Sequence, residues 1–306
     1  MNLLTVSPSP HIRGNETTSG IMRDVLIALI PAAVASVIIF GFRTLAVIAV
    51  CVCSCAIFEW AFEKLTKRDT TIGDLSAAVT GVLLAYNLPV TIPLWQCVVG
   101  SFVAIVVIKQ LFGGIGKNFA NPAITARIFM FLAFTGTMSR YIIPRSPDAV
   151  TGATPLMIMQ SGVGELPSAL DLFLGNHGGV LGETCALALI LGFAYLLIRR
   201  VIGWETPVIY VAVVFALTAA FGGNPVNAIL SGGLLLGAIF MATDYVTAPM
   251  TFWGRFVFGA GCGVLTVIIR QFGSYPEGVS FSILIMNILT PYLNRLTAAK
   301  PFGGVK

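Results

Sequence analysis

Long apolar runs separated by short polar stretches make up most of this 306-residue chain. A membrane-spanning helix needs about 20 predominantly apolar residues, and segments of this kind recur along the whole sequence. The segments 75–88, 206–221 and 227–243 are short or interrupted by glycine, so we expect their polar ends to line protein or a bound group. The pattern predicts an all-α polytopic membrane protein with about ten transmembrane helices. These lie near residues 24–42, 44–61, 75–88, 94–112, 119–135, 183–201, 206–221, 227–243, 255–272 and 279–296.

The composition supports a membrane protein rather than a soluble domain. Hydrophobic residues make up 57% of the chain and charged residues 10%, whereas a soluble domain carries about 25% charged residues. The formal net charge of +5 does not indicate nucleic-acid binding, because Lys and Arg in such a protein mostly reflect its topology. Residues 1–23 are polar and lack the pattern of a secretory signal peptide.

The distribution of Lys and Arg predicts the orientation. If the N-terminal segment (1–23) is cytoplasmic, 14 of the 18 basic residues fall on the cytoplasmic side, in agreement with the positive-inside rule. The C-terminal tail (297–306) is then also cytoplasmic, and the long connection 136–182 is extracytoplasmic. The basic residues left on the outer side are Arg43, Arg140, Arg145 and Arg270.

Three short motifs occur twice, at offsets of 155 to 161 residues. Leu75-Ser76 recurs as Leu230-Ser231, Val90-Thr91-Ile92-Pro93 as Val246-Thr247-Ala248-Pro249, and Ile108-Lys109-Gln110 as Ile269-Arg270-Gln271. The chain therefore divides into transmembrane repeats 24–135 and 183–296, each with five spans. Because five is an odd number, the two repeats must be inverted relative to each other, which places a site at their interface. A solute channel of the urea-transporter type would show the same repeat and is the main alternative function.

The connection 136–182 contains the polar heptapeptide Asp148-Ala149-Val150-Thr151-Gly152-Ala153-Thr154. This D-x-x-[ST]-G-A-T pattern resembles the site at which a flavin transferase esterifies FMN phosphate onto a threonine hydroxyl. The acceptor would be Thr154, on an exposed loop, and Asp148 and Thr151 would belong to the same site. Gly152 and Ala153 have almost no side chain, so a bulky donor could approach the backbone. An ordinary glycine-containing turn capped by threonine is the alternative.

A glycine-rich stretch, GGIGKNFANPA at 113–123, precedes the fifth apolar segment on the cytoplasmic side. Asn118 and Asn121 are three residues apart, so both amides would share one face of a helical turn. Amides both donate and accept hydrogen bonds, which suits the polar edge or the ribityl chain of a flavin. The alternative is that both residues only cap the following helix.

Asp244 lies at the end of the eighth apolar segment, where an ionisable group is expensive unless it is paired or hydrated. It could orient a cofactor or take part in cation passage. It could equally cap the next helix or pair with Arg255. Glu183 opens the sixth segment, where we expect a carboxylate to act as a helix cap.

The six cysteines all lie in apolar runs, which argues against a disulfide framework. On a helix Cys51 and Cys55 share one face, whereas Cys53 points nearly opposite, so these three residues do not suit a metal ion. His11 and His177 are far apart in sequence and are predicted on opposite sides of the membrane, so they do not indicate a metal site either. The chain also lacks Fe–S cysteine spacing and a dinucleotide fingerprint, so we expect it to be inactive alone.

Three longer stretches together carry a family resemblance: GGIGKNFANPAITAR at 113–127, DAVTGATPL at 148–156 and MATDYVTAPMT at 241–251. They resemble the D subunit (RnfD) of the Rnf ion-translocating oxidoreductases and, more distantly, the B subunit of the sodium-translocating NADH:quinone reductases. The resemblance covers nearly the whole chain.

The resemblance implies a translocase component in a bacterial or archaeal cell membrane, coupling electron flow between ferredoxin and NAD to movement of Na⁺ or H⁺. It implies covalent FMN on Thr154, which accepts electrons from a flavin on the G subunit of the complex. A second, non-covalent flavin such as riboflavin would lie between the repeats near Asn118 and Asn121, with Asp244 as a further cofactor-binding residue. The implied partners are Rnf subunits A, B, C, E and G, and a flavin transferase for maturation.

Overall fold

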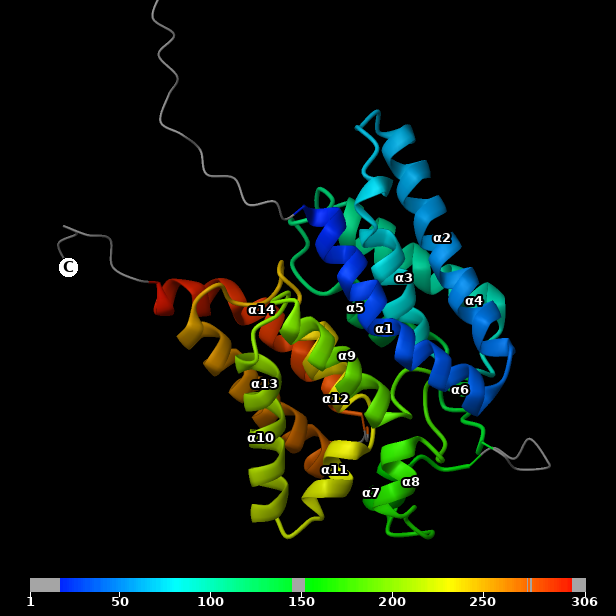
Figure 1. The fold of residues 1–306 in the computed structure, drawn as a ribbon, viewed down its shortest axis with the longest axis vertical. Coiled ribbons are helices and arrows are strands. Elements are labelled where there is room, and N and C mark those ends of the chain that lie inside the picture. The colour runs from blue at the N-terminus through cyan, green and yellow to red at the C-terminus, as the bar shows by residue number, and fades with distance from the viewer. Residues whose placement is uncertain (1–16, 145–151, 274, 276, 299–306) are drawn as a thin grey trace, which may run out of the picture.

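The computed structural model describes residues 17–144, 152–273, 275 and 277–298. Over these residues the secondary structure consists of helices joined by short connections, arranged as two neighbouring bundles (Figure 1). The first bundle contains the first half of the chain, and the second bundle contains the last third. The prediction of an all-helical protein is confirmed for the described residues.

The first bundle begins at Thr17, whose side chain accepts a hydrogen bond from the Gly20 amide and caps α1. Gly41 ends α1 with a φ of 82°, which glycine adopts without steric cost. The predicted fourth segment is one continuous rod, α-helical in its first part and π-helical in its second. The elements are α1 (Thr18–Phe40), α2 (Arg43–Leu65), η1 (Ile72–Asp74), α3 (Ser76–Tyr86), α4 (Leu94–Phe102), η2 (Val103–Gln110) and α5 (Pro122–Ala133).

The connection between the bundles contains three short helices that the apolar pattern did not indicate. They are α6 (Thr135–Met138), α7 (Pro155–Ser161) and α8 (Ala169–Leu174). Local capping accounts for the last two, because Thr154 and Ser168 each accept an amide hydrogen bond at the helix start. Gly162 and Gly175 end these helices in the left-handed conformation.

In the second bundle the predicted helix 227–243 is broken. Asn224 caps the short helix α11, and the chain then leaves helical geometry at Ser231, with Gly232 at a φ of 70°. A helix interrupted in this way exposes free backbone groups, which only protein or a cavity can satisfy inside a membrane. The elements are α9 (Ala186–Ile198), α10 (Glu205–Ala220), α11 (Pro225–Leu230), α12 (Leu234–Leu236), η3 (Gly237–Met241), α13 (Phe252–Phe272) and α14 (Val279–Thr297).

The two bundles meet along α1 and α9, which lie side by side (Figure 1), and along α5 and α14. Glycine permits close approach at the first of these contacts, since a Cβ on Gly192 would overlap the carbonyl oxygen of Ala28. Within the first bundle α2 packs on α3 and α4, and within the second α10 packs on α11 and α13. Gly81 of α3 serves the α2 contact in the same way, because its Cβ would lie 2.7 Å from the Cα of Val52.

Three of the described helices, α1, α2 and α13, are long and apolar enough to cross a membrane. Shorter apolar helices are α3, the α4–η2 rod, α5, α9 and α10. Large apolar side chains are exposed on the outside of the bundles, for example Ile38 at 71% and Ile57 at 60%. Such a surface is stable in lipid but not in water, so the chain is a multi-pass membrane protein.

Candidate functional site

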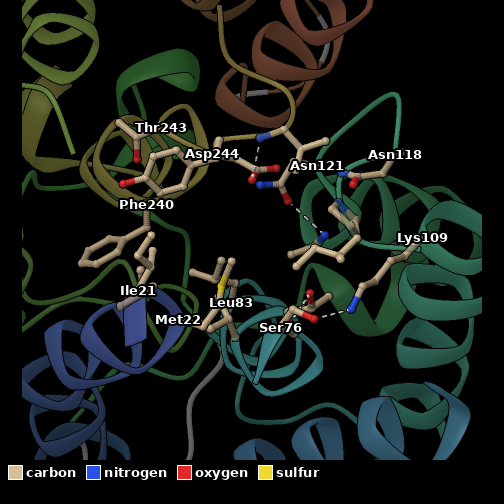
Figure 2. A pocket seen from close by; sticks show the side chains of 18 of the residues that line it. Ile21, Met22, Ser76, Leu83, Lys109, Asn118, Asn121, Phe240, Thr243 and Asp244 are labelled. Carbon is tan, nitrogen blue, oxygen red and sulfur yellow. Dashed lines mark hydrogen bonds between the residues drawn. The ribbon is translucent and has the colours of Figure 1, made fainter. Parts of the chain in front are cut away.

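A cavity of about 100 Å³ lies between the two bundles and has walls from both (Figure 2). We call it the inner cavity, because its polar walls come from the segments predicted to face the cytoplasm. The first bundle contributes α1, α3, the end of η2 and the start of α5, and the second contributes α9, η3 and the turn after it. The side chains labelled in Figure 2 are Ile21, Met22, Ser76, Leu83, Lys109, Asn118, Asn121, Phe240, Thr243 and Asp244.

The structure brings Asn118, Asn121 and Asp244 together in the wall of this cavity, although Asp244 is more than 120 residues away in sequence. Asn121 also caps α5, because its Oδ1 accepts hydrogen bonds from the amides of Ala123 (3.0 Å) and Ile124 (3.3 Å). Its Nδ2 donates to the Met241 carbonyl of the other bundle at 3.4 Å. Capping and cavity lining are therefore combined in one residue rather than being alternatives.

Asn118 and Asp244 are held by short-range hydrogen bonds. Asn118 Nδ2 donates to the Ala120 carbonyl at 3.0 Å. The Asp244 carboxylate accepts from the amide of Val246 (3.4 Å) and from the hydroxyl of Thr247 (3.1 Å), and burial raises the pKa of this carboxyl. The suggested pairing with Arg255 is not found, since the guanidinium of Arg255 lies 3.9 Å from the carboxylate of Glu205 instead.

Lys109 is a cavity residue that the sequence reasoning missed. Its Nζ donates to Glu59 Oε1 and to Ser76 Oγ, both at 2.6 Å, and the Lys109 and Glu59 side chains are only 4% and 0% exposed. Gln110 Nε2 donates to the same Glu59 oxygen at 2.9 Å. A lysine inside an apolar run is costly unless it is paired. Its position in the run could therefore have indicated that Lys109 has a buried partner.

Thr154 is not on an open surface. Its side chain is buried, with the residue 4% exposed, and its Oγ1 accepts a hydrogen bond from the Met157 amide at 3.3 Å. The hydroxyl donates to no acceptor among the described residues. Ala153 is exposed, and the Gly152 amide donates to the Tyr141 carbonyl at 3.1 Å. The expectation of an exposed acceptor is therefore wrong for the side chain, which is buried and caps α7.

Two residues of the predicted FMN site, Asp148 and Thr151, lie outside the described residues. Their contribution to the site stays a prediction. The structure therefore tests only the last three positions of the heptapeptide.

A polar cluster around Arg127 joins the two bundles outside the lining of the inner cavity. Arg127 of α5 donates to Asn87 Oδ1 and to Ser280 Oγ, both at 3.0 Å, and forms an ion pair with Glu277. The hydroxyl of Tyr141 donates to the other oxygen of Glu277 at 3.2 Å. These residues come from both bundles and from the connection, so the cluster links the bundles.

Glu183 does not cap α9, whose N-cap is Cys185. Its carboxylate is buried, and Glu183 Oε2 has no hydrogen-bond partner among the described residues. Cys51 and Cys55 are buried and Cys53 is exposed, as the helical spacing predicted. Within the described part of the chain no group of three or more His, Cys, Asp or Glu side chains could hold a metal ion.

Comparison with known proteins places this architecture in a family. The D subunit of the Na(+)-translocating ferredoxin:NAD(+) oxidoreductase complex of Acetobacterium woodii is 46% identical, over 99% of this chain and 96% of the relative. The D subunit of the proton-translocating ferredoxin:NAD(+) oxidoreductase complex of Clostridium ljungdahlii is 41% identical, over 99% and 97%. The D subunit of an ion-translocating oxidoreductase complex of Methanosarcina acetivorans is 33% identical, over 100% and 99%.

The family model for NQR2, RnfD and RnfE matches residues 5–303, which is nearly the whole chain. The relatives named above are D subunits of such ion-translocating oxidoreductase complexes, as the sequence motifs predicted. The chain therefore belongs to the NQR2, RnfD, RnfE family.

Proposed function

We propose that this chain is the membrane flavoprotein subunit of an ion-translocating ferredoxin:NAD oxidoreductase. It passes electrons between a flavin esterified to Thr154 and a second, non-covalent flavin in the inner cavity, in a complex that moves Na⁺ or H⁺. The observation that carries the proposal is the inner cavity itself, which gathers Asn118, Asn121 and Asp244 from both bundles. A group on Thr154 alone would leave most of a roughly 30 Å hydrocarbon core uncrossed, so an inner carrier is needed.

The chemistry of the inner cavity fits a flavin, whereas its present volume does not. The amides of Asn118 and Asn121, the Asp244 carboxylate and the Lys109 ammonium offer both donors and acceptors to a heteroatom-rich ring. The volume of about 100 Å³ is below the roughly 300–1,000 Å³ of small-molecule sites. Binding therefore requires wall side chains to rotate, and the flexible Met22 is suited to this movement.

The packing of the helices supports an arrangement of two inverted repeats. In each half the repeated Leu-Ser motif contacts the repeated motif that contains the cation. Lys109 donates to Ser76 in the first half, and Arg270 donates to Ser231 in the second. Two equivalent contacts in equivalent positions are expected if both halves share one fold. With ten crossings and cytoplasmic termini, repeat 1 (24–135) and repeat 2 (183–296) have opposite orientations and the connection 136–182 is extracytoplasmic.

Attachment at Thr154 is tested by in-gel fluorescence. The chain is co-expressed with the flavin transferase, denatured, separated on a gel and viewed under ultraviolet light. We expect a fluorescent band that is lost in Thr154→Ala and retained in Thr135→Ala, a control at the end of repeat 1. A fluorescent Thr154→Ala band would disprove the assignment.

The second flavin is tested by acid extraction of the purified complex. We expect wild-type protein to release flavin and the double variant Asn118→Leu/Asn121→Leu to release none, while its covalent band remains. If the wild type releases no flavin, the inner site is refuted and the two asparagines serve only as structural residues.

A solute channel is the alternative that an inverted repeat favours, and vesicles distinguish it. An electron carrier shows flavin absorbance that bleaches with reductant and no solute uptake, whereas a channel shows uptake without a chromophore. The proposed partners are Rnf subunits A, B, C, E and G. The coupling ion is left as Na⁺ or H⁺, since the names of the two relatives above differ in this respect.

A further inference from the structure

A second cavity, of about 390 Å³, opens beside α7, and none of the residues that line it lines the inner cavity. We call it the outer cavity. Four of the seven residues of α7, namely Leu156, Ile158, Met159 and Gln160, line it. Its other walls come from the end of α10, from α11 and from the last turns of α13, where Val267, Arg270 and Gln271 contribute. Its volume lies within the range of about 300–1,000 Å³ for small-molecule sites.

The outer cavity begins two residues after Thr154. Leu156 packs against Gly232, at the break between α11 and α12, in the space that a Cβ on Gly232 would take. The guanidinium of Arg270 reaches the same glycine, at 3.1 Å from this Cβ position. Gln160 Nε2 donates to the Gly273 carbonyl at 2.9 Å, so both ends of α7 are fixed against the second bundle. Thr154 therefore caps a helix whose two ends are both fixed against the second bundle, and the cavity wall begins two residues further along the chain.

The sequence repeat makes Arg270 the counterpart of Lys109. Each cation lies near the C-terminal end of the fourth span of its half and contacts the repeated Leu-Ser pair. Lys109 Nζ donates to Ser76 Oγ at 2.6 Å, and Arg270 Nη2 donates to the Ser231 carbonyl at 3.2 Å. Lys109 lines the inner cavity and Arg270 lines the outer one. The two repeated cations thus each line a cavity, one in the inner cavity and one in the outer cavity.

The two cations differ in their charge balance. Lys109 is neutralised by Glu59 at 2.6 Å. Arg270 has no carboxylate within ion-pair distance among the described residues, and it donates only to the carbonyls of Ala228 (2.6 Å) and Ser231. Its Nε is buried without any hydrogen-bond partner in this part of the chain. A buried donor without a partner is costly, and an unpaired guanidinium favours a nearby anion.

We propose that the outer cavity holds the isoalloxazine ring of the flavin attached at Thr154, and that Arg270 stabilises the negative charge of the reduced ring. The proposal rests on attachment at Thr154. Reduction by one electron adds one negative charge to the ring, and a reduced flavin of a partner protein on the same membrane face supplies this electron. Arg270 supplies the compensating positive charge and remains protonated throughout. The inner cavity has no such excess of positive charge, because Glu59 already balances Lys109.

A redox titration tests the role of Arg270. The full chain, co-expressed with the transferase, is titrated optically, and the Thr154→Ala spectrum is subtracted to isolate the covalent flavin. We expect Arg270→Gln to lower the preference for the reduced form at least tenfold, which is a shift of about 59 mV to lower potential for one electron. Arg270→Lys should retain most of the wild-type potential. Arg140→Gln removes a cation from the exposed outer surface and should leave the potential unchanged.

The position of the ring is tested on the wild-type chain. This test needs no variant, so a variant that fails to fold cannot affect its result. Iodide quenches flavin fluorescence by collision, and we expect the covalent flavin to be quenched several-fold less than free FMN. Quenching equal to that of free FMN would overturn the proposal, as would an unchanged potential in Arg270→Gln. A missing fluorescent band in wild-type protein would instead refute attachment at Thr154, which separates failure of the proposed function from failure of this inference.

Discussion

Replacing Lys109 with methionine should destabilise the protein by an amount that depends on pH. Lys109 Nζ and Glu59 Oε1 are 2.6 Å apart and their side chains are 4% and 0% exposed. At an effective dielectric constant of about 20 their attraction is roughly 6 kcal/mol, and desolvation of both groups offsets much of it. In Lys109→Met the Glu59 carboxylate keeps only the hydrogen bond from Gln110, and loss of one partner of a buried pair costs about 3–5 kcal/mol.

Proton uptake by Glu59 limits the destabilisation of Lys109→Met and determines how it changes with pH. Glu59 can avoid an unpaired buried charge by binding a proton, which costs about 1.36 kcal/mol for each pH unit above the ordinary glutamate pKa of about 4.3. The limit is therefore about 4 kcal/mol at pH 7 and about 1 kcal/mol at pH 5. The folded variant binds one more proton than its unfolded state, so its stability rises as pH falls. The double variant Glu59→Gln/Lys109→Met has no buried charge and should recover most of the lost stability at both pH values.

Equilibrium unfolding in mixed detergent micelles measures these free energies for the wild type, both single variants and the double variant. Lys67→Met, at an exposed lysine beyond α2, is the matched control and should stay within about 0.5 kcal/mol of wild type. Equal destabilisation by Lys109→Met at pH 5 and pH 7 would refute the reasoning. So would a double variant that is no more stable than Lys109→Met.

Three further outcomes follow from the structure. Gly192→Ala should lower the unfolding temperature, because the new Cβ overlaps the Ala28 carbonyl between α9 and α1 and overpacking costs about 1–3 kcal/mol. The control Gly136→Ala should leave the unfolding temperature unchanged, because no atom lies within 4 Å of its new Cβ. Burial lowers the pKa of His177, so the neutral imidazole's contribution to stability is complete above the ordinary histidine pKa and is lost as pH falls below it. The unfolding temperature of His177→Gln should therefore fall less than that of wild type between pH 7 and pH 5. The purified chain should not oxidise NADH, and a measurable rate in a spectrophotometric assay would contradict its dependence on partner subunits.

Several features of the fold could be predicted from the sequence because their causes are local. Apolar runs of sufficient length form helices in a membrane whatever the rest of the chain does. Asn121 followed by Pro122 marks a helix start, and the structure begins α5 at Pro122. Cys53 faces away from Cys51 and Cys55 because helical periodicity fixes their directions.

Other features of the candidate site depended on contacts between distant residues. The sequence pointed to Asn118, Asn121 and Asp244 separately, but only the packing of the two bundles puts them in one cavity. Lys109 is 50 residues from Glu59, and no local pattern states that α2 and η2 turn these side chains toward each other. The burial of Thr154 was also missed, because α7 is a short helix that its cap and its packing stabilise rather than its own apolar pattern.

The sequence by itself determined that this is a helical membrane protein, where most of its apolar helices lie, and to which family it belongs. Those properties follow from the length of apolar runs and from short motifs, and both are read along the chain. The tertiary structure alone decided which polar groups share a cavity, which cations are neutralised and how far Thr154 is from solvent. The physical reason is that the stability of a buried charge depends on the groups nearest to it in space. In this chain those partners are far away in sequence, as Arg127 and Glu277, 150 residues apart, illustrate.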